Sequence, residues 1–291
     1  MAWWLGTLVL PCMIGCGDGG PSPAPPPTAV AAVTAAMPQC PANVPAIPYS
    51  VDYHEGTGRG LLVALSGGDG TQYLSDQEGL PFLQAARAAG WSVAQVKWSR
   101  SWWQGAEGAG IVAYACRPAN VLWNLYNTKF NGGEFVLFGH SGGASQAAYA
   151  VEYYGLDVIV DRVLLSGGPP HATLTKSCTC APASYCYNDA LRAAIDKAYG
   201  WGDCAARSAA GTARWDADSC ALSSPNYRHP GTTFDFFSGD QDDNAVRQAS
   251  LDYLNALGAA TTATNWTLVP GTGHRVYATA QGRAALLGAL Q

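Results

Sequence analysis

The chain has 291 residues, enough to bury the core of one large domain or two small ones. Hydrophobic residues make up 48% of it, so it is neither disordered nor fibrous, and only 13% are charged. The net charge is −5 and Lys and Arg form no cluster, which argues against a nucleic-acid-binding protein. No apolar run reaches the ~20 residues of a membrane-spanning helix, which excludes a polytopic membrane protein.

The first residues are typical of a targeting signal. Trp3 to Leu10 form an apolar stretch that is too short to span a bilayer but suits the hydrophobic region of a secretory signal. Met13-Ile14-Gly15-Cys16 follow, and a small residue directly before a cysteine resembles the bacterial lipobox. That resemblance implies cleavage before Cys16 and attachment of a lipid to it. The alternative is an ordinary secretory signal in which Cys12 and Cys16 have no role.

Composition divides the chain into a signal peptide at 1–15, a tether at 16–45 and a folded domain at 46–291. Pro, Ala and Gly dominate the tether, and this composition cannot bury a core, so we expect it to be semi-extended. We expect an exported monomer, either a cell-envelope lipoprotein or a secreted protein. A lipid on Cys16 would be its only contact with a membrane.

Cysteine usage agrees with export, because an exported protein oxidises most of its cysteines to disulfides. Seven cysteines lie beyond Cys12 and Cys16, namely Cys40, Cys116, Cys178, Cys180, Cys186, Cys204 and Cys220. Seven is odd, so at least one is expected to stay free or to pair between chains. A zinc site beginning at Cys178 is the alternative, but the spacing matches no common zinc pattern. The sequence does not indicate which cysteines pair.

Apolar runs that suit buried strands alternate with helical segments from residue 61 onward. The expected strands are 61–65, 91–98, 135–138, 163–165, 233–237 and 266–269, and the expected helices are 80–89, 111–130, 144–154, 245–257 and 276–290. Pro118 marks a kink or a fresh start within 111–130. The alternation predicts an α/β fold with a mostly parallel sheet covered by helices, in which sites form at the carboxyl ends of the strands.

Residues 171–230 interrupt this alternation between the fourth and fifth expected strands. They hold five of the cysteines and many small or polar residues, and one helical segment is expected at Asp189 to Tyr199. We interpret this insertion as a disulfide-stapled cap over the strand ends. The alternative is a peripheral decoration with no role in substrate access.

Gly139-His140-Ser141-Gly142-Gly143 directly follows the third expected strand and precedes a helix. This is the Gly-x-Ser-x-Gly nucleophile elbow. Its turn is so tight that side chains two residues before and after the serine would clash, and the helix N-terminus favours negative charge that develops there. With 34 glycines in the chain a chance match to this motif is plausible, so the strand before it and the helix after it are what favour Ser141 as a nucleophile. Ser66 and Ser166 also end strands but lack the first glycine, and we interpret them as turn residues.

A triad acid is expected after a later strand. Asp240, Asp242 and Asp243 follow the fifth expected strand, and we choose Asp242, with Asp243 second and Asp240 third. Asp240-x-Asp242-x-Asn244 also copies the start of a calcium loop. Ala245 stands where that loop needs glycine, however, and its bidentate glutamate is missing, so no metal is expected.

The general base follows by elimination among His54, His140, His171, His229 and His274. Only His274 lies beyond the aspartates, in a glycine-containing loop after the sixth expected strand. We interpret His140, which is next to Ser141, as a structural residue of the elbow. His171 and His229 flank the insertion and receive no role.

An oxyanion hole needs two preorganised backbone N–H groups. Gly142, directly after the nucleophile, is expected to supply one. Gly68 or Asp69, in the loop after the first expected strand, is expected to supply the other, and an ordinary glycine turn is the alternative. Trp98, Trp102 and Trp103 lie in or beside the loop after the second expected strand, where they line a substrate pocket or simply pack in the core.

From about residue 60 to its end the chain resembles the α/β-hydrolase superfamily of serine esterases and lipases. The segments LLVALSGGDG, FVLFGHSGG, FFSGDQDD and LVPGTGH carry the resemblance in order and spacing. It implies Ser141 as nucleophile, His274 as general base and Asp242 as the orienting acid. No subfamily is recognised, and the cysteine-rich insertion matches no lid that we can place.

These residues predict an exported serine hydrolase that cleaves carboxylic esters through an acyl-enzyme, without a cofactor. The expected substrate is a small-molecule or polymeric ester. Two alternatives stay open: a peptidase or thioesterase on the same triad, and a non-catalytic lipoprotein that binds small molecules.

Overall fold

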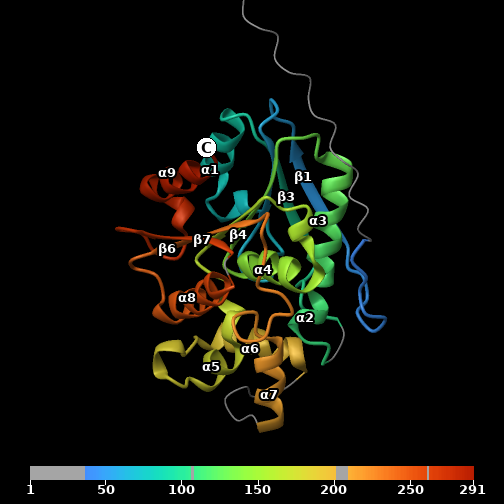
Figure 1. Ribbon diagram of the computed structural model, residues 1–291, viewed down its shortest axis with the longest axis vertical. Coiled ribbons are helices and arrows are strands. Elements are labelled where there is room, and N and C mark those ends of the chain that lie inside the picture. The colour runs from blue at the N-terminus through green and yellow to red at the C-terminus, as the bar shows by residue number, and fades with distance from the viewer. Residues whose placement is uncertain (1–36, 106–107, 201–208, 261) are drawn as a thin grey trace, which may run out of the picture.

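The computed structural model describes residues 37–105, 108–200, 209–260 and 262–291. The expected signal peptide, Cys16, most of the expected tether and Cys204 lie outside these residues. A seven-stranded sheet runs through the molecule, with helices on both faces (Figure 1). Within the described ranges, no helix is both long and apolar enough to cross a membrane.

The strand order in the sheet is β1-β3-β2-β4-β5-β6-β7. The strands are β1 Tyr49–His54, β2 Gly60–Leu65, β3 Ser92–Trp98, β4 Glu134–His140, β5 Arg162–Ser166, β6 Thr233–Gly239 and β7 Ala263–Val269. β1 pairs antiparallel with β3, and the other neighbours pair in parallel. The predicted α/β fold with a mostly parallel sheet is therefore confirmed. β1 was not among the expected strands, because this half-exposed edge strand alternates polar and apolar side chains and contains no continuous apolar run.

The α-helices are α1 Leu80–Ala88, α2 Ile111–Tyr114, α3 Cys116–Lys129, α4 Gly142–Tyr154, α5 Leu174–Thr179, α6 Asp189–Tyr199, α7 Ala209–Asp218, α8 Asn244–Ala259 and α9 Ala280–Ala289. Short 3₁₀ turns are η1 Leu74–Gln77, η2 Leu156–Val158, η3 Pro170–Thr173, η4 Ala183–Tyr185 and η6 Val276–Ala278. The expected helix at 111–130 is broken, with α2 and α3 meeting at Ala115. Pro118 lies in the first turn of α3, where its missing N–H costs no hydrogen bond.

Side chains of the strands alternate between two hydrophobic cores, one on each face of the sheet. Leu62 and Ala64 of β2 pack with α1 and α9, whereas Leu61 and Val63 pack with α3, α4 and α8. In Figure 1 α1 and α9 lie together on one side of the sheet, and α3 lies on the other. Burial of each Leu or Phe side chain in these cores contributes about 2 kcal/mol to the free energy of unfolding. The packed sheet therefore holds the loops at its edge in place.

The insertion leaves the sheet after β5 and returns at β6, as predicted, and its helices α5, α6 and α7 gather at one end of the molecule (Figure 1). A disulfide joins Cys180 to Cys186, and Cys178 is disulfide-bonded as well. Cys220 is a buried free thiol, in agreement with the odd cysteine count.

The chain is fastened to the domain from Cys40 onward, before the expected boundary at residue 46. Cys40 forms a disulfide with Cys116 of α3. The buried guanidinium of Arg117 donates hydrogen bonds to the carbonyl oxygens of Pro45, Trp102 and Gln104. These contacts tie the end of the tether to the loop after β3.

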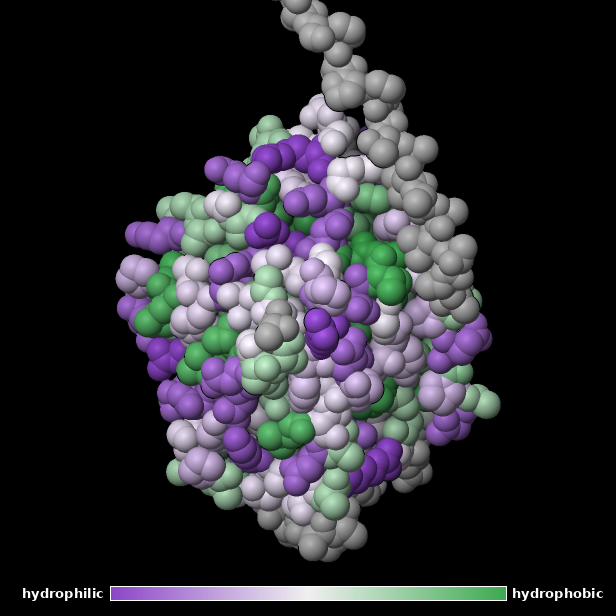
Figure 2. Space-filling model, viewed as in Figure 1, coloured by the Kyte–Doolittle hydropathy of each residue, from purple (hydrophilic) through white to green (hydrophobic). Residues whose placement is uncertain are grey.

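On the face of the molecule in Figure 2, hydrophobic residues form small separate patches among polar ones. The large apolar side chains that are exposed belong to different elements, as Leu80 in α1, Val158 in η2 and Leu268 in β7 illustrate.

Candidate active site

The turn between β4 and α4 holds Ser141 in a strained conformation. Its φ of 51° and ψ of −116° are values that a non-glycine residue rarely adopts. The Ser141 N–H donates to the carbonyl oxygen of Ser166, 2.9 Å away, which joins the turn to the end of β5. A Cβ atom at Gly139 would lie 2.5 Å from the oxygen of Gly143, and one at Gly143 would lie 2.1 Å from the oxygen of Leu65. The turn therefore tolerates only glycine at these two positions.

Asp242 and His274 are brought together by the loops that follow β6 and β7. Nδ1 of His274 lies 2.8 Å from Oδ1 of Asp242. The N–H of Asp243 donates to the same oxygen at 2.7 Å. The side chain of Asp242 is only 1% exposed, and its Oδ2 has no hydrogen-bond partner among the described residues. A buried carboxylate that accepts hydrogen bonds on one oxygen fixes the imidazole firmly in place.

The three candidate aspartates have different partners. Oδ1 of Asp240 accepts a hydrogen bond from the N–H of Thr272, and Oδ1 of Asp243 caps α8 by accepting from the N–H of Ala245. Asp242 alone of the three is hydrogen-bonded to His274. The structure thus distinguishes between side chains that the sequence leaves as alternatives.

The bond to Asp242 also determines the tautomer of His274. A carboxylate has only acceptors, so Nδ1 carries the ring proton of a neutral His274 and Nε2 keeps a lone pair. The His274 side chain is 39% exposed. In this tautomer Nε2 is the nitrogen that can accept a proton.

Gly167 and Gly168, at the end of β5, lie against both Ser141 and His274. A Cβ atom at Gly167 would lie 2.7 Å from the backbone oxygen of His274 and 3.0 Å from its Nδ1. A Cβ atom at Gly168 would lie 3.1 Å from the backbone oxygen of Ser141. The same glycine pair thus contacts the backbones of both residues at one edge of the sheet. The sequence shows these glycines only as a turn after a strand.

His140 packs directly against His274. Their ring centroids are 4.8 Å apart, and Tyr277 lies 4.9 Å from His140 on another side. Nδ1 of His140 donates to the carbonyl oxygen of Ser166 at 3.1 Å. Burial, and to a lesser extent the neighbouring His274, hold the pKa of His140 well below its ordinary value. His140 is therefore a neutral ring beside the candidate base.

The loop after β2 lies against the start of α4. A Cβ atom at Gly142 would lie 1.9 Å from the backbone oxygen of Gly68, so only glycine allows this approach. The loop is held by its own bonds: the N–H of Gly67 donates to the side chain of Gln77, and Asp69 accepts from the backbone and hydroxyl of Thr71. Gly142 and the Gly68–Asp69 segment are thus neighbours, as an oxyanion hole made from these two segments requires.

The three tryptophans at the end of β3 and in the loop after it are buried in the hydrophobic core. Trp98, Trp102 and Trp103 are 2%, 0% and 6% exposed. The indole N–H of Trp98 donates to Gln146, and Trp103 packs edge-on against the ring of His171. These contacts agree with core packing, one of the two alternatives from the sequence.

A half-open cleft of about 300 Å³ lies beside the candidate acid and base. His274 and Asp242 line one part of it. The rest of its lining consists of Asn188 and Leu191 at the start of α6, Gln241 in the loop after β6, and Asp243 and Val246 at the start of α8. The insertion therefore takes part in the site. Sequence reasoning missed Asn188, Leu191 and Val246, because nothing in their local pattern separates them from other helix-start residues.

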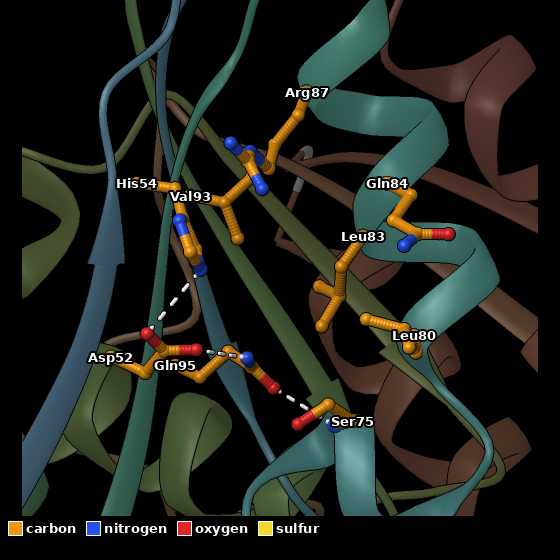
Figure 3. Close-up of a pocket in the computed structure, with 9 residues that line it drawn as sticks. All are labelled: Asp52, His54, Ser75, Leu80, Leu83, Gln84, Arg87, Val93 and Gln95. Atoms are coloured by element: carbon orange, nitrogen blue, oxygen red, sulfur yellow. Dashed lines mark hydrogen bonds and ion pairs between the residues drawn. The ribbon is translucent and has the colours of Figure 1, made fainter.

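A second and smaller pocket lies between β1, β3 and α1 (Figure 3). Its polar side chains bond to one another: His54 pairs with Asp52, Asp52 accepts from Gln95, and Gln95 accepts from the N–H of Ser75. These bonds connect the polar side chains of β1 and β3 to η1.

No protein-family model matches the sequence, and no curated protein sequence matches it. Similar solved structures do exist. An esterase from Pyrobaculum calidifontis is 13% identical with a TM-score of 0.57, and the match covers 84% of this chain and 79% of that one. Est1E from Butyrivibrio proteoclasticus is 10% identical with a TM-score of 0.53, covering 84% and 92%. An acylaminoacyl peptidase from Pyrococcus horikoshii is 10% identical with a TM-score of 0.55, covering 80% and 36%. The chain therefore has the α/β-hydrolase fold that the sequence predicted.

Proposed function

We propose that this protein is an exported serine hydrolase that cleaves carboxylic esters through an acyl-enzyme on Ser141. The hydrogen bond between Asp242 and His274 carries the proposal, because it unites an acid and a base from separate loops. The glycine pair after β5 contacts the backbones of both His274 and Ser141, which supports the proposal that these two residues act together. Esterases of the same fold supply the precedent for ester substrates.

In the proposed reaction Nε2 of His274 takes the proton of the Ser141 hydroxyl as its oxygen attacks the ester carbonyl carbon. Asp242 holds the imidazole in the required tautomer and stabilises the imidazolium that forms. The carbonyl oxygen becomes an oxyanion, which the N–H of Gly142 and an N–H of Gly68 or Asp69 stabilise. Each such donor contributes about 3 kcal/mol to the transition state.

The tetrahedral intermediate then collapses. The bond from the carbonyl carbon to the alcohol oxygen breaks, and His274 gives its proton to that oxygen, so a neutral alcohol leaves and Ser141 stays acylated. Water repeats the sequence: His274 takes a proton from it, the hydroxide oxygen attacks the acyl carbon, and Ser141 receives the proton back. The products are an acid and an alcohol, and no cofactor is needed.

Turnover of p-nitrophenyl acetate and butyrate tests this proposal. Ser141→Ala is expected to reduce turnover to the uncatalysed background and to abolish labelling by a fluorophosphonate probe. Ser166→Ala is the matched control, since its hydroxyl is buried near the same turn and has no partner among the described residues. Labelling that survives in Ser141→Ala would reject Ser141 as the nucleophile.

The same measurements separate the alternatives. An acylaminoacyl peptidase has this fold, so anilide and peptide substrates are run beside the esters, and faster turnover of the amides would favour a peptidase. A wild-type protein that neither labels nor turns over any substrate would be a binding protein.

Export is part of the proposal and is supported by the disulfides Cys40–Cys116 and Cys180–Cys186, which form and persist in oxidising compartments. We propose a lipid on Cys16 as the anchor. Cys16→Ser is expected to move the protein from the membrane fraction to the soluble one, and an unchanged distribution would favour a secretory signal without a lipid.

A further inference from the structure

The cleft beside His274 is built from two parts of the chain that meet across it. Leu191 and Asn188 belong to the start of α6 in the insertion, and Asp243 and Val246 to the start of α8. Asn188 caps α6 by accepting from the N–H of Leu191, and Asp243 caps α8, so both helix starts are fixed. Two capped helix starts therefore form opposite parts of the lining of this cleft, which has a volume of about 300 Å³.

The cleft lies on the His274 side of the candidate triad. His274 and Asp242 belong to its lining, whereas Ser141 does not contribute to it within the described part of the chain. Under the proposed function the imidazole gives its proton to the departing alcohol oxygen, so the alcohol must lie next to the imidazole. A space that borders the general acid rather than the nucleophile is thus placed for the leaving group.

From this relationship we propose that the cleft between α6 and α8 is the alcohol subsite, and that Leu191 of the insertion determines how large an alcohol it accepts. The inference deepens the proposed function and rests on it. The volume of about 300 Å³ is at the lower end for ligand pockets, so it suits short-chain or single-ring alcohols.

The charges around the cleft add a preference between alcohols. Two carboxylates, Asp242 and Asp243, line it, and its lining in the described ranges contains no Lys or Arg. Three arginines that are neighbours of lining residues in the sequence or on the same helices have partners of their own: Arg192 lies 3.6 Å from Asp189, Arg275 lies 3.2 Å from Glu78, and Arg247 donates to the backbone oxygen of Asp240. Leu191 and Val246 supply the apolar contact. The subsite therefore takes neutral alcohols in preference to anionic ones.

Two substrate series test the subsite. One consists of acetate esters of methanol, butanol, benzyl alcohol and naphthylmethanol, and the other of methyl esters of acids of rising chain length. Leu191→Trp is expected to lower kcat/KM for the two aromatic alcohols about tenfold relative to methyl acetate, while the acid series keeps its wild-type profile. Leu191→Ala is expected to shift the alcohol series the other way, toward larger alcohols.

Ala193→Trp is the matched control, because Ala193 is exposed on the same helix and is not part of the cleft lining. It is expected to leave both series unchanged. Thermal melting verifies that each variant is folded, and Leu191→Ala keeps the test decisive if Leu191→Trp does not fold.

A charge series extends the test. Wild type is expected to hydrolyse the acetate ester of glycolate more slowly than the acetate ester of glycolamide, which carries no charge. Asp243→Asn is expected to reduce the ratio of these two rates several-fold at low salt. Asn also caps helices, so α8 keeps its start. The effect is expected to shrink at high salt, as it does for exposed charges.

The outcomes distinguish the two proposals. A change in the acid series with an unchanged alcohol series would make the cleft an acyl site, and unchanged profiles in both series would remove Leu191 from specificity; either result overturns the inference alone. A wild-type protein without ester turnover or probe labelling overturns the proposed function and the subsite with it.

Discussion

The imidazole ring of His140 packs against that of His274, with centroids 4.8 Å apart, although the two residues are far apart in the sequence. His140 ends β4 immediately before Ser141, whereas His274 follows β7. Ring packing thus links the residue beside the proposed nucleophile to the proposed base. It supplements the hydrogen bond by which Asp242 orients His274.

His140→Ala is therefore expected to lower kcat about tenfold with little change in KM, because the His274 ring loses a packing surface and spends less time in its productive orientation. Steady-state kinetics with p-nitrophenyl acetate gives both constants. A rise in KM at constant kcat would instead indicate that His140 acts on substrate binding.

Asp242→Asn is expected to lower kcat by about 10³-fold or more, because an amide no longer fixes the His274 tautomer or stabilises the imidazolium. Asp240→Asn and Asp243→Asn are the controls. Each of these side chains accepts a backbone N–H that asparagine also satisfies, so both variants should stay within a few-fold of wild type with neutral esters. A larger loss in Asp243→Asn than in Asp242→Asn would reassign the acid.

His171 makes the folded protein sensitive to acid. It is buried, and burial lowers its pKa to about 4. An unfolded chain holds a proton on this histidine below pH ~6.5, whereas the folded chain does not until about pH 4, so folding stability falls between these values by about 3 kcal/mol. His171→Gln keeps a polar partner for Ser145. Its melting temperature should fall less than that of wild type when the pH is lowered from 7 to 4. Parallel pH dependence in the two proteins would contradict this.

His229 has the opposite effect. Burial alone would lower its pKa, but the hydrogen bond to Glu152 and the neighbouring Asp157 outweigh burial and raise it. A raised folded-state pKa means that the stabilisation is complete below the unfolded value and is lost as the pH rises through the folded value. The melting temperature of His229→Gln should therefore fall less than that of wild type as the pH rises from neutral to alkaline. An unchanged slope there would show that the charge on His229 does not matter.

The parts of the fold that the sequence predicts are those with a strong local signal. Leu61 to Leu65 is continuously apolar and forms the buried strand β2, and the glycines around Ser141 reflect a turn that excludes any side chain. The choice between Asp240, Asp242 and Asp243 had no local signal. All three are short carboxylates at a strand-to-helix junction, and only the position of a loop 30 residues later separates them.

The role of the insertion illustrates the same limit. Leu191 has the helical spacing of any amphipathic helix start, and its place beside His274 results from packing between distant segments. The helix pattern correctly indicates α6, but no periodicity indicates what α6 faces. The edge strand β1 was missed although YSVDYH alternates apolar and polar residues, because the expected strands were based on continuous apolar runs, and a half-buried edge strand has none.

The disulfide between Cys40 and Cys116 closes a loop of 76 residues that contains β1, β2, β3 and α1. Closing a loop of this length restricts the unfolded chain enough to favour the native state by about 4 kcal/mol, a large share of the total stability of an ordinary domain. Production of this protein in a reducing cytosol would forfeit that contribution. Oxidative folding, in a periplasm or with a thiol oxidant supplied, is the appropriate route to material for every experiment above.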